Sequence, residues 1–328
     1  MGFASGRVLR GVLCVALGGI CWGFSGTCAQ LLTAIYGVPV SWVICLRLAG
    51  AALMYLVACL VANRQGLVAL LRDRRSVGGV FVFSLLGVLL VQICYVSCIS
   101  HTNSGTATVF ERMGLIIIML FTCITMRRRP LKRELLAVVM ALAGAVCIAT
   151  KGNLGSLSIS PLGLLWGVGS AVSLAFYTLL PEKLLNRWGS LPVTSLAMVF
   201  AAIVANAAVQ PWTMDVQVTP EIVAAMIAMI VFGTFCAYLL FLHGLKDAGP
   251  MLAGLVGSIE PVAATVISAL WLGTYVGPFD IAGCALIVVM VFLVTQRDGG
   301  SGAVAPAEDA GAAVASGNGD GSRDTDTR

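Results

Sequence analysis

The sequence predicts an all-α integral membrane protein in which ten transmembrane helices form two inverted five-helix repeats. Three features indicate this class: too few charged residues for a water-facing surface, long apolar segments that recur along the chain, and a weak similarity between the two halves. Of the 328 residues, 59% are hydrophobic and 11% are charged, whereas soluble domains carry about 25% charged residues. Alternation of polar and apolar residues is absent, which argues against a transmembrane β-barrel.

Each predicted helix is an apolar segment long enough to cross about 30 Å of hydrocarbon. Turn-forming residues separate the segments, as in Tyr36-Gly37-Val38-Pro39 after the first and Lys151-Gly152-Asn153 after the fifth. Prolines or glycines also close the seventh and ninth segments, and the links are short, so we expect no soluble domain between helices. The predicted helices are residues 10–31, 39–62, 77–100, 103–126, 134–151, 161–181, 192–210, 221–244, 249–272 and 277–296.

The basic residues predict the orientation of the chain in the membrane. If the N-terminus is cytoplasmic, every Lys and Arg outside the helices except Lys151 lies on the cytoplasmic side, as the positive-inside rule requires. We therefore expect a multi-pass protein of the cell (plasma) membrane with both termini in the cytoplasm. Residues 1–9 are the predicted cytoplasmic N-terminus. Residues 297–328 lack apolar periodicity and are expected to form a disordered cytoplasmic tail.

The halves of the chain, residues 10–151 and 161–296, share features at nearly constant spacing. Pro39-Val40-Ser41 opens the second predicted helix and Pro192-Val193-Thr194 opens the seventh. Further matches pair Phe24 with Phe176, Gly87 with Gly233, Tyr95 with Phe241 and Ala107 with Ala253. An odd number of helices in each half would place the halves in opposite orientations. Inverted repeats are typical of secondary transporters, whose substrate site lies near the membrane midplane between the halves.

Three motifs carry a resemblance to a known family: "GGICWGFSG" at residues 18–26, "CLRLAGAAL" at 45–53 and "GSIEPVAATVISALWLGT" at 257–274. With these motifs the chain resembles the EamA-type transporters of the drug/metabolite transporter superfamily, over residues 10–296. The resemblance implies two five-helix EamA repeats, a cavity open alternately to either side, and export of small metabolites. One feature departs from the family, because Leu115 stands where the first half usually carries a proline.

A charged pair, Glu111 and Arg112, lies inside the fourth predicted helix. A charge near the bilayer centre costs at least about 2.5–3.5 kcal/mol on insertion scales. Neighbouring residues point about 100° apart on a helix and make a poor mutual pair, so these side chains should find partners elsewhere. Two interpretations stay open: binding of substrate or protons, and a structural ion pair between helices.

Two further charges lie within predicted helices. Glu260 precedes Pro261, which leaves a backbone carbonyl near Gly257 without its helical partner. Glu260 could therefore receive a proton or a cationic group, or form a buried hydrogen bond that locks the ninth helix. Arg47 could extend to the outer headgroups, or pair with Glu111 or Glu260.

Aromatic and polar side chains recur on single faces of other predicted helices. Trp22, Gln92, Tyr95, Tyr177 and Tyr238 are the candidates for substrate contact. Tyrosine hydroxyls and amides need polar partners away from lipid, which favours a cavity lining. Packing within an apolar core is the alternative.

Catalytic and cofactor motifs are absent from the sequence. There is no Walker motif, the two histidines lie in distant segments, and the eleven cysteines are interpreted as buried apolar residues. We expect no cofactor, no metal and no nucleic acid partner, and no enzyme activity. The predicted function is a secondary transporter of small metabolites or drugs, embedded in the lipid bilayer. A membrane-embedded lipid-handling protein or enzyme, or a channel, is the alternative; monomer and homodimer both stay open.

Overall fold

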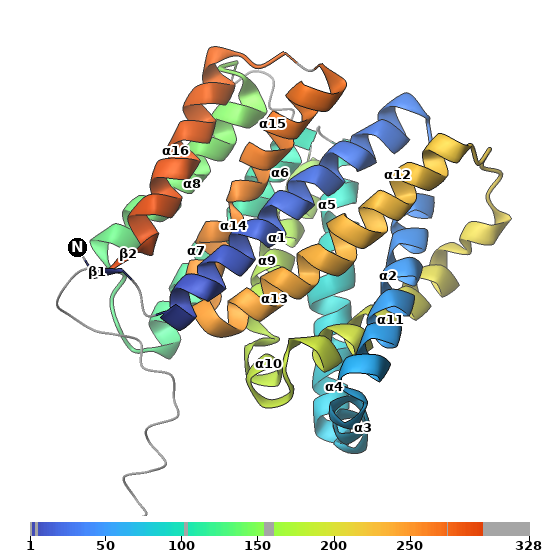
Figure 1. The fold of residues 1–328 in the computed structure, drawn as a ribbon. Helices are drawn as coiled ribbons and strands as arrows, with labels where there is room; N and C mark the ends of the chain where they lie inside the picture. The colour runs from blue at the N-terminus through green and yellow to red at the C-terminus, as the bar shows by residue number, and fades with distance from the viewer. Residues whose placement is uncertain (1, 4–5, 102–103, 154–160, 274, 298–328) are drawn as a thin grey trace, which may run out of the picture.

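The fold is a bundle of helices (Figure 1). The computed structural model describes residues 2–3, 6–101, 104–153, 161–273 and 275–297, so nearly all of the predicted disordered tail lies outside the described residues. In chain order the elements are β1 (Gly2–Phe3), α1 (Gly6–Gln30), η1 (Leu31–Ile35), α2 (Val40–Ala62), α3 (Arg64–Arg72), α4 (Arg74–Val82), η2 (Phe83–Leu89), α5 (Leu90–His101), α6 (Ser104–Arg112), α7 (Gly114–Thr125), α8 (Lys132–Thr150), α9 (Pro161–Leu179), α10 (Glu182–Trp188), α11 (Ser190–Val209), η4 (Pro211–Thr213), α12 (Pro220–Ile230), η5 (Val231–Cys236), α13 (Ala237–Ala248), α14 (Pro250–Gly257), α15 (Ile259–Leu272), α16 (Pro278–Thr295) and β2 (Gln296–Arg297). The segments η1, η2 and η5 are π-helical, and η4 is a 3₁₀ turn.

Within the described ranges, eight helical stretches are long and apolar enough to cross a membrane, and Pro278–Val294 is a shorter apolar helix. The fourth and ninth predicted helices are each divided in two: α6 is separated from α7 at Met113, and α14 from α15 at Ser258. The sequence did not predict the short helices α3 and α10, which occupy the links after the second and sixth predicted helices.

The helices pack in four long pairs. In Figure 1, α8 and α16 lie side by side at the left and α2 and α11 at the right, while α1 and α13 cross the front of the bundle and α5 packs against α9 behind them. α1 also packs on α15, and α9 packs on α6 and α7. The helices α1 and α9, together with the helices that pack on them, enclose the middle of the bundle.

Glycines of the first sequence motif explain why α1 can approach two helices closely. A Cβ at Gly18 would lie 3.0 Å from the Ala237 carbonyl of α13, and a Cβ at Gly23 would lie 2.8 Å from the Glu260 carbonyl of α15. Small residues allow such close backbone contact between membrane helices. The motif therefore fixes α1 against the helix that carries Glu260.

The basic links predicted to be cytoplasmic meet at one end of the bundle. Arg187 of α10 forms an ion pair with Asp73, with 3.0 Å between Nη2 and Oδ2. Arg10 at the start of α1 lies 2.6 Å from Asp247 at the end of α13, and Arg133 donates a hydrogen bond to the carbonyl of Leu293. These contacts join the link after α2 to α10, the start of α1 to the end of α13, and the start of α8 to α16.

Asp73 caps the N-terminus of α4 at this end of the bundle. Its carboxylate accepts hydrogen bonds from the Ser76 hydroxyl at 2.9 Å and from the backbone N–H groups of Arg75 and Ser76. The Ser76 hydroxyl, followed by these backbone donors and Arg187, holds the pKa of Asp73 below its ordinary value of 3.8. The ionised carboxylate is thus the form that the fold stabilises.

We expect Asp73→Ala to lower the melting temperature in detergent at pH 7 and to have a smaller effect at pH 3. A lowered pKa in the folded state gives stability that is present above the ordinary carboxyl pKa and is lost as the pH falls through the folded value. Asp215→Ala, which removes an exposed acid from another link, is the matched control. An equal loss at both pH values would contradict this electrostatic account of the cap.

Candidate functional site

An ion pair joins the two divided helices at the centre of the bundle. Arg112 is the last residue of α6, and its Nη2 atom lies 2.7 Å from Oε2 of Glu260, the second residue of α15. Glu111 is more distant, with 3.8 Å between its Oε2 and the same nitrogen. The Arg112 side chain is 6% exposed, against 15% for Glu111 and 32% for Glu260. Arg112 was expected to find a partner on another helix, and that partner is Glu260.

Proline accounts for the helix break beside Glu260. Pro261 has no N–H group to bond the Gly257 carbonyl, α14 ends at Gly257, and Ser258 has the flattened backbone angles φ −65° and ψ −2°. The break places Glu260 in the first turn of a new helix, α15. Pro261 and Gly257, the predicted hinge residues, thus lie on the two sides of the break.

The break beside Arg112 forms without a proline. The N–H group of Met113 is shared between the carbonyls of Val109 at 3.2 Å and Phe110 at 3.0 Å, which tightens the last turn of α6. Gly114 then brings α7 against α9, because a Cβ there would lie 2.6 Å from the Ala171 carbonyl. The departure from the family pattern at Leu115 therefore leaves a break in this helix as well.

The predicted aromatic residues meet beside the ion pair. The Trp22 ring lies 6.1 Å from that of Tyr177 and 5.3 Å from that of Tyr238, measured between centroids, and the two tyrosine rings are 5.6 Å apart. The Tyr238 hydroxyl bonds the side chain of Gln92. Phe241 completes the cluster at 4.8 Å from Trp22. These side chains pack on one another in a single cluster.

Electrostatic contacts connect the aromatic cluster to the charges. Tyr177 and Tyr238 both lie within electrostatic reach of Glu260. Tyr95 is similarly placed beside Arg112. The predicted candidates, which come from six separate predicted helices, thus gather in one region of the bundle.

Arg47 lies within electrostatic reach of Tyr238 and makes its own hydrogen bond to η5. Its Nε donates to the Thr234 hydroxyl at 2.9 Å, and Tyr55, two turns further along α2, donates to the Phe235 carbonyl at 2.5 Å. Both acceptors lie in the π-helical segment η5, where the wider turn frees backbone groups. In the described structure no ion pair joins Arg47 to Glu111 or Glu260, and its hydrogen bond goes to η5 instead. Tyr55 and Thr234 were not predicted from the sequence. The spacing of Tyr55 from Arg47, which places both on one side of the same helix, was the available signal for Tyr55.

Several buried polar atoms of this region lack a partner among the described residues. They are Nε of Arg112 and the hydroxyl oxygens of Ser170, Tyr177 and Ser258. A buried polar group without a hydrogen bond costs about 1–3 kcal/mol, so such atoms fit a site that holds water or a polar ligand. Within the described ranges, no group of three His, Cys, Asp or Glu residues could hold a metal ion.

Comparison with known proteins gives a consistent family. A model described as the EamA-like transporter family matches residues 9–150 and again residues 161–296. The uncharacterized inner membrane transporter YicL of Salmonella typhimurium is 30% identical over 290 residues, which are 88% of this chain and 96% of the relative. Protein PecM of Dickeya dadantii is 21% identical over 73% of this chain and 82% of its own. A crystal structure with 17% sequence identity aligns with a TM-score of 0.72 over 89% of this chain and 96% of that chain, which shows a common fold.

Proposed function

Because the chain belongs to the EamA-like transporter family, we propose that it is a secondary transporter that exports small metabolites or drugs by alternating access. The family match and the apolar helices make it a multi-pass transporter of the cell membrane that acts on small molecules. We further propose the outward direction of transport, the alternating-access mechanism and the roles of single residues given below.

The proposed architecture is ten transmembrane helices in two inverted repeats, residues 10–151 and 161–296. Equivalent contacts recur in the two halves and support it: α1 packs on α13 as α9 packs on α5, while α2 meets α11 and α8 meets α16 across the halves. The matched glycines behave alike, since a Cβ at Gly87 would meet Tyr177 and a Cβ at Gly233 would meet Ser25. The helix breaks at Met113 and Ser258 also stand at equivalent positions of the two halves.

Both termini are proposed to lie in the cytoplasm. The ion pairs that join the basic links at one end of the bundle support this orientation, because cytoplasmic links carry an excess of Lys and Arg. Figure 1 places α3, α10 and the start of α1 at this end.

The ion pair between Arg112 and Glu260 carries the functional proposal. It joins one broken helix of each half, and discontinuous helices at a repeat interface form the substrate and ion sites of many transporters. Arg112 is the proposed partner of a substrate carboxylate, because its Nε is buried without a partner in the described structure. Glu111 and Glu260 are the proposed proton or cation sites. The nearby Trp22, Tyr177 and Tyr238 would cover the apolar part of the substrate.

The test is a metabolite-uptake panel in inverted membrane vesicles, where export appears as uptake. We expect Glu111→Gln to reduce uptake and to flatten its dependence on pH, because glutamine neither binds a proton nor balances a cation. Glu221→Gln changes an exposed glutamate at the start of α12 and serves as the matched control. Uptake and pH dependence unchanged in Glu111→Gln would overturn the role of Glu111. Counterflow without saturation or trans-stimulation would overturn the carrier mechanism.

A further inference from the structure

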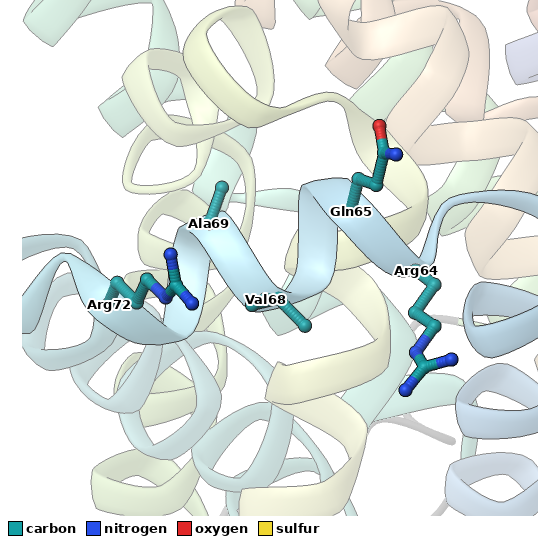
Figure 2. Close-up of a pocket in the computed structure, with 5 residues that line it drawn as sticks. All are labelled: Arg64, Gln65, Val68, Ala69 and Arg72. Carbon is teal, nitrogen blue, oxygen red and sulfur yellow. The ribbon is translucent and has the colours of Figure 1, made fainter.

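The short helix α3 has a buried apolar side and a basic exposed side. It lies between the membrane-spanning stretches Val40–Ala62 and Arg74–Tyr95, which places it at the membrane surface. Leu67 and Leu70 are buried at 5% and 0% exposure against the bundle. Figure 2 shows the opposite side, with arginines at its two ends. The residues that line this shallow hollow are Arg64, Gln65, Val68, Ala69 and Arg72.

Among the described residues, no acidic side chain forms an ion pair with the arginines of this hollow. The nearest acid in the sequence, Asp73, is engaged by Arg187 and by the N-terminus of α4. Across the described ranges, no ion pair involves Arg64, Arg72 or their neighbours Arg74 and Arg75. Four arginines within a dozen residues are therefore free of ion pairs within the described part of the chain and available to bind an anion.

Exposed apolar residues accompany these arginines. Val68 is 39% exposed and Leu71 is 49% exposed, and both lie between Arg64 and Arg72 along α3. A helix in the membrane interface buries its apolar side chains at the boundary between headgroups and acyl chains. Arg64 and Arg72 are separated by eight residues, about 12 Å along a helix. The hollow lies between these two arginines.

We propose that the α3 hollow binds the headgroup of an anionic phospholipid from the adjacent leaflet. The guanidinium groups of Arg64 and Arg72 bind the phosphate, for which their planar donor geometry is suited. The Gln65 amide donates to a further headgroup oxygen, Ala69 leaves room for the glycerol, and Val68 and Leu71 contact the start of the acyl chains. This surface is distinct from the central ion pair and does not depend on the transported substrate.

Native mass spectrometry of the full chain in detergent tests the proposal, with phosphatidylglycerol and phosphatidylcholine as the probes. We expect the wild-type protein to retain phosphatidylglycerol in preference to phosphatidylcholine. Arg64→Gln/Arg72→Gln should lose about tenfold or more of this retention, because each surface arginine contributes comparably to anionic-lipid binding. Arg127→Gln/Arg129→Gln removes the same charge from another basic link, and this variant should retain phosphatidylglycerol as the wild type does. Melting temperatures show whether each variant is folded. If Arg64→Gln/Arg72→Gln is not folded, Arg64→Lys/Arg72→Lys is used in its place, and we expect it to retain an amount of phosphatidylglycerol between that of the wild type and none.

Three results would overturn the proposal. The α3 variant could retain phosphatidylglycerol as the wild type does. The Arg127 and Arg129 variant could lose as much retention as the α3 variant, in which case net charge alone explains the binding. Millimolar inorganic phosphate could displace the lipid completely, in which case the hollow is a site for the free anion and Val68 and Leu71 have no part in it.

Discussion

Replacing Arg112 by methionine is expected to abolish transport and to destabilise the protein by about 3–5 kcal/mol, the usual cost when one partner of a buried ion pair is removed. The Glu260 carboxylate at 2.7 Å and the Glu111 carboxylate at 3.8 Å would both lose their counter-charge. Equilibrium unfolding in detergent measures the loss of stability, and uptake into inverted vesicles measures transport. Arg10→Met is the matched control, because the Arg10 side chain is 60% exposed and its buried partner Asp247 keeps a second ion pair with Arg7 at 3.3 Å, so we expect a smaller loss of stability.

A double variant separates the structural role of this pair from its functional role. Arg112→Met/Glu260→Met removes both charges, and apolar replacements of buried ion pairs are often neutral or stabilising. We therefore expect the double variant to recover most of the stability without recovering transport. If it transports at the wild-type rate, the pair serves only to hold the helices together.

The membrane class and the family could be predicted from the sequence because both depend on local patterns. Apolar segments of spanning length are visible in composition alone, and the glycine motif at residues 18–26 reflects contacts of a single helix with its neighbours. The family prediction is confirmed by the match over two stretches of the chain. Inverted topology and helix count remain predictions supported by equivalent contacts.

The partners of the buried charges could not be assigned from the sequence. Arg112 and Glu260 are 148 residues apart in the chain, and their 2.7 Å contact depends on how two helices cross. Arg47 was expected to reach the outer headgroups or to pair with Glu111 or Glu260, and its partner is instead the buried hydroxyl of Thr234 in the π-helical turn η5. Such a turn has no clear sequence signal. Both the turn and its contacts depend on how the helices pack against one another.

The ends of the helices could not be fully predicted from the sequence for a similar reason. The sequence treats residues 103–126 as one helix, yet the shared N–H group of Met113 and the close contact of Gly114 with α9 divide it. The helix α3 was missed because its arginines were assigned to a link and its few buried residues are too short a stretch to span a membrane. In each case a local preference was outweighed by contacts with distant segments.

Gly23→Val is expected to separate α1 from α15 and thereby to reduce both stability and transport. A Cβ at this position would lie 2.7 Å from the Ala264 nitrogen and 2.8 Å from the Glu260 carbonyl, and these backbone atoms cannot move aside as a flexible side chain can. Overpacking costs about 1–3 kcal/mol, and here it would displace the first turn of α15, which carries Glu260. We therefore expect a lower melting temperature together with a loss of uptake that exceeds the loss of folded protein.

Gly26→Val provides the matched control on the same helix. Gly26 is exposed, and a Cβ there would meet no atom within 4 Å, so the same substitution should change neither melting temperature nor uptake. Gly23→Ala introduces only the Cβ and should give an intermediate effect if backbone contact is the cause. If Gly23→Val behaves like Gly26→Val, the close contact of α1 with α15 does not position Glu260. If both variants lose stability equally, contact with α15 is not the cause, because valine has a higher helix propensity than glycine and adds no helix cost of its own, and the motif at residues 18–26 then has another role.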